Sequence, residues 1–226
     1  KRQRRRPGVR LLAGLLHHRR GRYREALPEL SAALSLYRAR GDRSGLIACA
    51  FILVETLIFL DRTSAVLEVA GVMRSEADAA EWRMLRVTYP IGLALNDRFE
   101  EAEAEWRASA AGDAFGRDSD LELAMSGAYA NYMLIPLGRL DEALALMERV
   151  VAGLRRRDVY GRLAMNLAFL AHVRFEQGCW REARDAMKEA IRVAVERGWP
   201  GFVPSMRLML ARIAAAAGDE DAGPLL

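Results

Sequence analysis

One six-residue phrase, Gly178-Cys179-Trp180-Arg181-Glu182-Ala183, recurs through the chain and predicts its fold. The pattern is glycine, any residue, an apolar residue, any residue, glutamate and alanine. Further copies begin at Gly21 and Gly138, and at Asp97 with aspartate in place of glycine; a degenerate copy begins at Asp61. The closing alanines are Ala26, Ala65, Ala102, Ala143 and Ala183. A phrase that returns about every 40 residues predicts a stack of helical hairpins.

Each residue type in the phrase has a physical role at a junction between two helices. Glycine, or less readily aspartate, can adopt the left-handed conformation that ends a helix. Glutamate in the first turn of the next helix suits the positive end of the helix dipole. Alanine lets two helix backbones approach closely. Each repeat unit is therefore predicted to be a pair of antiparallel helices.

Apolar residues at three- and four-residue steps predict helices on both sides of each turn. First helices are expected over residues 9–20, 43–60, 78–95, 119–136, 159–177 and 202–217. Second helices are expected over residues 23–40, 62–76, 98–111, 140–156 and 180–197. Asp42 and Ser119 are predicted N-caps. Gly41-Asp42, Gly112-Asp113 and the run from Gly198 to Gly201 are predicted breakers between units.

We therefore predict an all-α fold, a right-handed α–α superhelix of about eleven helices. Residues 1–8 are expected to form a basic linker or tail, and residues 9–226 the solenoid. The predicted units cover residues 9–41, 42–76, 77–112, 118–157, 158–198 and, truncated, 202–226.

Composition and charge exclude several classes of protein. The formal charge of +4 is concentrated in the first six residues, and elsewhere Arg and Glu are interspersed, so no nucleic-acid partner is expected for this segment. The most apolar stretch, residues 46–60, is too short to cross a membrane, so no membrane partner is expected. Cys49 and Cys179 are far apart in the sequence, which favours reduced thiols and a cytoplasmic location.

Sequence motifs for chemistry are absent. There is no phosphate-binding GxxxxGK[ST] loop, no HExxH and no CxxC. We therefore predict no catalytic residues, no metal, no cofactor and no enzymatic activity. His17 and His18 precede Arg19 and Arg20 near a predicted helix end, where positive charge suits the dipole.

The repeat unit resembles the tetratricopeptide repeat (TPR). The matching residues are Gly14, Gly21, Tyr23, Ala26 and Ala33 in the first unit, and Ala171, Gly178, Trp180 and Ala183 in the fifth. The usual period is 34 residues, so helices about one turn longer are expected here. Such variants resemble the superhelical domain of the large ATP-dependent LuxR-type transcription regulators, such as the maltose-regulon activator. The second and third units depart from the pattern, with Leu53 in the small-residue place and Pro90 inside a first helix.

The resemblance implies that the first helices line a concave groove. A register of 40 residues aligns Tyr132, His172 and Arg212 on neighbouring first helices. The candidate groove residues are Met125, Ala128, Tyr132, Met165, His172, Ser205 and Arg212. Methionine, aromatic and charged side chains of this kind are typical of a peptide- or ligand-binding surface.

These observations favour a protein-, peptide- or inducer-binding scaffold. It is expected to be the TPR segment of a larger bacterial transcriptional or signalling regulator, in contact with flanking domains. The alternatives are a free-standing TPR adaptor, an enzyme on a helical scaffold and a nucleic-acid-binding module that uses the basic run. The truncated sixth unit predicts an exposed last helix, through which a homodimer could form.

Overall fold

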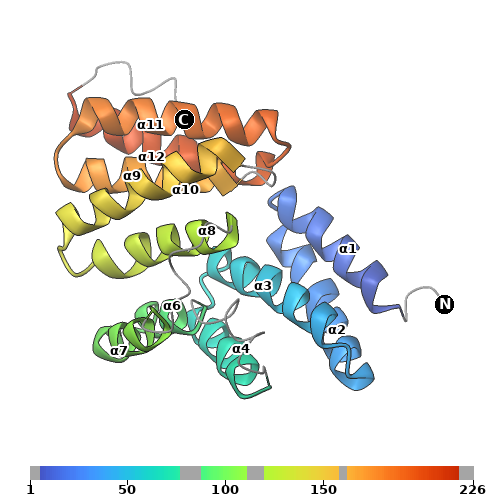
Figure 1. Ribbon diagram of the computed structural model, residues 1–226. Coiled ribbons are helices and arrows are strands. Elements are labelled where there is room, and N and C mark those ends of the chain that lie inside the picture. The colour runs from blue at the N-terminus through green and yellow to red at the C-terminus, as the bar shows by residue number, and fades with distance from the viewer. Residues whose placement is uncertain (1–5, 77–87, 111–119, 158–161, 219–226) are drawn as a thin grey trace. The chain divides into compact units, whose positions relative to one another are not determined.

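The computed structural model describes residues 6–76, 88–110, 120–157 and 162–218 (Figure 1). Within these ranges the chain forms helices joined by short turns, and no strand is present. The predicted all-α, helical-repeat fold class is confirmed. None of the described helices is long and apolar enough to cross a membrane.

The chain divides into two compact units, Lys1–Ala114 and Phe115–Leu226. The sequence predicts one continuous solenoid from residue 9 onward. The division falls beside Gly112 and Asp113, which the sequence marks as a breaker. Glycine disfavours helix continuation, which agrees with a boundary near this place.

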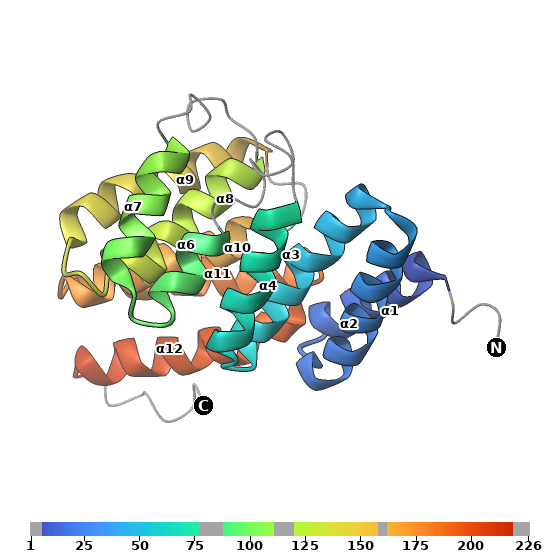
Figure 2. The ribbon, with the colours of Figure 1, turned by 90° about the horizontal axis from the view of Figure 1, so that it is seen from below.

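The first unit contains six described helices. They are α1 (Pro7–Arg19), α2 (Tyr23–Arg40), α3 (Arg43–Phe59), α4 (Thr63–Glu76), α6 (Thr88–Ala94) and α7 (Phe99–Ala110). Each helix packs against the next, and α1 also reaches α3, as a stack of hairpins requires. In Figure 1 and Figure 2, α1 and α2 lie side by side. Helix α3 is apolar on all sides because α2 and α4 both cover it.

The second unit repeats the arrangement. Its helices are α8 (Asp120–Tyr129) with the π-helical turn η2 (Ala130–Leu134), α9 (Leu140–Arg157), α10 (Arg162–Glu176), α11 (Trp180–Glu196), the 3-10 turn η3 (Pro200–Phe202) and α12 (Val203–Ala216). Consecutive helices pack in chain order, and α10 also contacts α8 and η2. First helices therefore neighbour first helices, as in other repeat solenoids.

The turn residues of the phrase are left-handed, as predicted. Gly21, Gly138 and Gly178 have φ of 72°, 70° and 77°, and Asp61 and Asp97 have φ of 55° and 59°. At Gly178 the amide of Gly178 donates to the carbonyl of Phe175 and the next amide to that of Arg174, at 2.9 and 2.8 Å. These two bonds form a Schellman motif, which satisfies carbonyl groups left open at the helix end.

The helix ends differ from the prediction in a few places. Asp42 caps α3, accepting a 3.0 Å hydrogen bond from the amide of Gly45, whereas Ser119 lies outside the described residues. Helix α1 begins at Pro7, two residues early, because the missing proline N–H has no intrahelical partner in a first turn. Pro90 lies in the first turn of α6, for which the same reason holds. Residues 77–87 are not described.

Small residues set the distance between paired helices. A side chain at Gly14 would come within 2.6 Å of Leu30 Cδ2, and Leu30 is completely buried. Ala171, the equivalent of Gly14 in the fifth unit, is also completely buried. A small residue at this position of the first helix therefore makes room for a large apolar side chain of the second helix.

His18 is buried and neutral, so the prediction that it adds positive charge to a helix end is wrong. Its Nδ1 lies 2.9 Å from Thr56 Oγ1, and the Thr56 hydroxyl donates to the carbonyl of Ile52 at 2.7 Å. The hydroxyl must therefore accept from His18 Nδ1–H. Burial and the nearby Arg19 lower the pKa of His18 to about 4. Desolvation is the larger cause because the side chain is 1% exposed, even though Glu55 Oε2 lies 3.6 Å from Nε2.

We predict that His18 makes the first unit sensitive to acid. Its folded-state pKa of about 4 lies below the unfolded value near 6.5, so the unfolded chain binds the proton first as pH falls. The free energy of unfolding should fall between about pH 6.5 and 4, by at most about 3 kcal/mol. Urea denaturation at several pH values, with His18→Leu as the comparison, measures this. Parallel pH profiles for the two proteins would contradict it, because the carboxylates titrate equally in both.

We predict that the left-handed turn itself contributes to stability at Gly178. An added Cβ there meets nothing within 4 Å, so Gly178→Ala tests backbone conformation without a steric clash. The free energy of unfolding should fall by about 1 kcal/mol. Gly178→Asp should cost less, because the chain itself uses aspartate at Asp61 and Asp97. Urea denaturation of both variants checks the order, and an alanine variant as stable as the parent would disprove it.

Candidate functional site

The predicted groove residues lie on the three first helices of the second unit. Tyr132 lies in η2, His172 in α10 and Arg212 in α12. In Figure 1, α8 and α10 are seen from the side and α12 lies behind α9 and α11. These helices give the unit a face formed by first helices, which we call the A face; we use the name for Asn131, Tyr132, Phe169, His172, Phe175, Glu176 and Arg212.

A polar chain links η2 to α10 at the centre of the A face. His172 Nδ1 lies 2.9 Å from Asn131 Oδ1, and His172 Nε2 lies 3.4 Å from Glu176 Oε1. The imidazole can donate Nδ1–H to the amide oxygen, and in its charged form it also donates Nε2–H to the carboxylate. The amide of Asn131 therefore orients the ring in both protonation states, and the carboxylate of Glu176 accepts a hydrogen bond only when the ring is charged.

Aromatic contacts flank this polar chain on each side. The rings of Tyr132 and Phe169 meet edge to face, with centroids 5.8 Å apart. The Arg212 guanidinium carbon lies 5.6 Å from the centre of the Phe175 ring, within the range of a cation–π contact. Tyr132, His172 and Arg212 thus each contact a different neighbour, namely Phe169, Asn131 and Phe175.

The π-helical turn explains why two consecutive residues reach the same neighbouring helix. The amide of Ile135 donates to the carbonyl of Ala130 at 3.1 Å, five residues back. Such a turn holds more residues than an α-helical turn, so successive side chains are separated by a smaller angle. Asn131 and Tyr132 can therefore both face α10. Turns of this kind are frequent at functional sites.

Sequence reasoning missed Asn131, Phe169, Phe175 and Glu176. The sequence could have predicted part of this set. Phe169 and Glu176 belong to a series of positions spaced by four, three and four residues, which places them on one face of a helix: Met165, Phe169, His172 and Glu176. No sequence pattern predicted the position of Asn131, because consecutive residues of a regular α-helix point in directions farther apart than those of a π turn.

The other predicted residues contribute less. Met165 and Ala128 are half-buried. Ser205 uses its hydroxyl within its own helix start, donating to the carbonyl of Phe202 at 2.9 Å. The side chain of Met125 lies outside the described part of the structure.

The electrostatic environment keeps His172 less basic than a free histidine. Burial lowers its pKa most, and the charge of Arg212 lowers it further, while Glu176 raises it. The net shift is downward, so His172 is neutral at pH 7. A neutral imidazole offers one donor and one acceptor, which suits the amide groups of a peptide.

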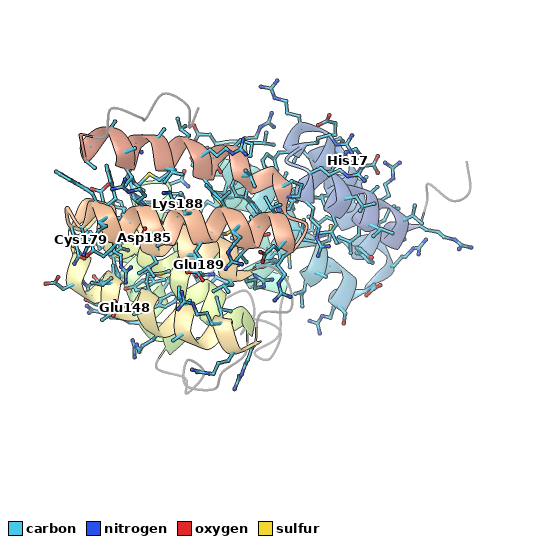
Figure 3. The ribbon with its side chains drawn as sticks, turned by 90° about the horizontal axis from the view of Figure 1, so that it is seen from above. His17, Glu148, Cys179, Asp185, Lys188 and Glu189 are labelled. Atoms are coloured by element: carbon cyan, nitrogen blue, oxygen red, sulfur yellow. The ribbon has the colours of Figure 1, made fainter. Side chains whose placement is uncertain are left out.

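The opposite side of the unit is a solvated charged surface. Figure 3 labels Asp185, Lys188 and Glu189 along α11 and Glu148 on α9. Charges there pair across helices: Arg155 lies 2.7 Å from Glu189. Among the described residues, no group of three His, Cys, Asp or Glu side chains is placed to hold a metal ion.

Comparison with known proteins places the chain in a family. The family described as anaphase-promoting complex subunit 5 matches residues 9–61 and 133–206, together more than half of the chain. The chain belongs to this family. Its members are TPR-like helical-repeat proteins, so the helical-repeat part of the predicted resemblance is confirmed. The matched ranges contain the copies of the repeat phrase that begin at Gly21, Gly138 and Gly178, and they leave out the copy that begins at Asp97.

Two solved structures have a similar fold. PlcR of Bacillus thuringiensis, in complex with the peptide PapR7 and DNA, has a TM-score of 0.65 at 14% identity, over 84% of this chain and 68% of PlcR. BtubC (BKLC) of P. vanneervenii has a TM-score of 0.55 at 14% identity, over 97% of this chain and 88% of BtubC. At this identity the likeness is one of fold. The search of curated proteins found no match.

We predict that the two charged neighbours of His172 shift its pKa in opposite directions. Arg212→Gln removes a repelling cation, so the pKa should rise, and Glu176→Gln removes an attracting anion, so it should fall. Titration of the imidazole by NMR in the three proteins should give the order Arg212→Gln, parent, Glu176→Gln, from highest to lowest. The reverse order, or no change in either variant, would show that these groups do not surround His172.

Proposed function

We propose that this chain is a protein- or peptide-binding scaffold and that the A face of the second unit is its binding surface. One observation carries the proposal: three neighbouring first helices contribute linked polar and aromatic groups to a single face. Asn131 and His172 are joined at 2.9 Å, and Tyr132 and Phe169 meet edge to face. These side chains are only half-buried, so they can still contact a ligand.

The chemistry of the A face suits an extended peptide. Tyr132 and Phe169 offer apolar area with little conformational entropy to lose, as aromatic anchors of binding surfaces do. Asn131 and His172 can exchange hydrogen bonds with peptide amides. Arg212 is exposed and can pair with a carboxylate of the ligand. The peptide complex of PlcR, a protein of similar fold, supports this ligand class.

The charge distribution favours a peptide over nucleic acid. Arginines of the described helices pair with glutamates, among them Arg74 with Glu105 at 2.7 Å and Arg192 with Glu196 at 2.9 Å. In the described helices such pairs place negative charge beside these arginines, which does not favour contact with a phosphate backbone there.

The wider setting is also part of the proposal. We place the chain in a larger bacterial transcriptional or signalling regulator, related to the LuxR-type regulators, in which flanking domains respond to the bound peptide. No catalytic role is proposed. A cytoplasmic location agrees with Cys49, whose burial raises its thiol pKa to about 12 and makes it unreactive. A homodimer through α12, where Leu208 is exposed, remains a separate prediction.

The proposal predicts that three substitutions on the A face abolish peptide binding. Peptides are first selected from a displayed random library on the intact chain. Tyr132→Ala, His172→Ala and Arg212→Glu together should weaken the selected peptides by more than tenfold, because they remove an aromatic anchor, a hydrogen-bonding group and a favourable charge. Fluorescence anisotropy measures the dissociation constants.

The control combines the same kinds of change on α11, namely Trp180→Ala, Lys188→Ala and Arg181→Glu. These side chains are exposed on a second helix of a repeat, so binding should be unchanged. Equal affinity of the A-face variant and the parent would overturn the proposal. So would a loss of binding in the α11 variant alone.

A further inference from the structure

On two first helices of the second unit, a single A-face residue lies between two buried residues. His172 on α10 separates Ala171 and Val173, which are both completely buried. Arg212 on α12 is placed in the same way, because its two neighbours in the sequence are 7% and 0% exposed. Each of these two helices therefore directs one side chain to the A face at this point of the repeat.

The first helix formed by α8 and η2 has two residues at the same point. Ala130 and Met133 are completely buried, and the half-buried Asn131 and Tyr132 lie between them. The hydrogen bond that closes η2, from the amide of Ile135 to the carbonyl of Ala130, spans five residues, whereas an α-helical bond spans four. The turn η2 therefore holds one residue more than α10 and α12 have there.

The extra residue lies in η2 because the chain is held in place on both sides of it. Before η2, Gly127 on α8 lies so close to the buried Asn166 on α10 that no side chain would fit at Gly127. After η2, Gly138 has a φ of 70°, and its amide donates to the carbonyl of Ile135 at 2.9 Å. A shift of either segment by one residue would break these contacts, so the insertion is accommodated between them.

Asn131 is the member of the inserted pair that determines the chemistry of His172. Its Oδ1 lies 2.9 Å from His172 Nδ1, and because an amide oxygen can only accept, Nδ1 carries the hydrogen. The neutral ring then has its lone pair on Nε2, which lies 3.4 Å from Glu176 Oε1. Without Asn131 the other tautomer would be favoured, in which Nε2–H donates to the Glu176 carboxylate.

Two acceptors are therefore available to a ligand beside His172, namely Nε2 and the partly exposed carboxylate of Glu176. We propose that Asn131 is an inserted, specificity-determining residue, which holds His172 as a hydrogen-bond acceptor and so makes the A face select a ligand with an N–H donor at this point. The charge of Arg212 acts on the same ring and disfavours an ammonium group, so the donor is a backbone amide. This inference rests on the peptide-binding function proposed for the A face.

The tautomer of His172 tests the role of Asn131 without any ligand. Long-range proton–nitrogen NMR correlations, recorded above the imidazole pKa of each protein, should show Nδ1–H in the parent. Asn131→Leu should show Nε2–H, whereas Asn131→Asp should keep Nδ1–H because its carboxylate also accepts. Nε2–H in the parent, or the same tautomer in the parent and Asn131→Leu, would overturn the proposal.

Deletion of Asn131 tests whether it is an insertion. The shortened chain places Ala130 seven residues before Gly138, as Ala171 is before Gly178, so a regular α-helix can form. The urea midpoint should be no lower than in the parent, while peptides selected on the parent should bind more than tenfold more weakly. A lower midpoint, or binding as tight as in the parent, would overturn the proposal. Asn131→Leu keeps the chain length and should weaken the same peptides by a similar factor.

N-methylation of a selected peptide, one backbone amide at a time, identifies the donor. One position should weaken binding to the parent by more than tenfold and leave binding to Asn131→Leu unchanged. If acetylation of a peptide lysine has this effect instead, the donor is an ammonium group and the amide is ruled out. If no peptide binds the parent, the proposed function fails, whereas the tautomer result still decides the role of Asn131.

Discussion

The left-handed turn at the end of each first helix is the constraint on which the rest of the structure depends. A single residue with positive φ, Gly21, Asp61, Asp97, Gly138 or Gly178, reverses the chain and lays the next helix back along the previous one. Isolated helices of this length are marginally stable in water. Only the reversal brings two apolar stripes together, so burial and helix formation reinforce each other in every unit.

Repetition of this constraint also creates a surface. Side chains on neighbouring first helices line up on one face, which in the second unit brings the polar pair Asn131 and His172 beside Tyr132 and Phe169.

Two histidines show how strongly burial decides the role of the same side chain. His18 is enclosed by Thr56, Tyr23 and Phe59, so it is a neutral part of the core and links stability to pH. His172 is about one-third exposed, and its charged neighbours act on it in opposite directions. The first is therefore a structural group, while the second keeps part of its ring open to solvent.

The sequence by itself determined the helix class, the turn residues and the cap at Asp42. These features follow from local rules, namely helical periodicity and backbone preference, repeated about every 40 residues. Only the tertiary structure decided that Asn131 orients His172, that a π turn directs Asn131 toward α10, and that His18 is neutral. Those outcomes depend on the stagger between helices and on desolvation, which arise when distant segments pack and leave no periodic trace in the chain.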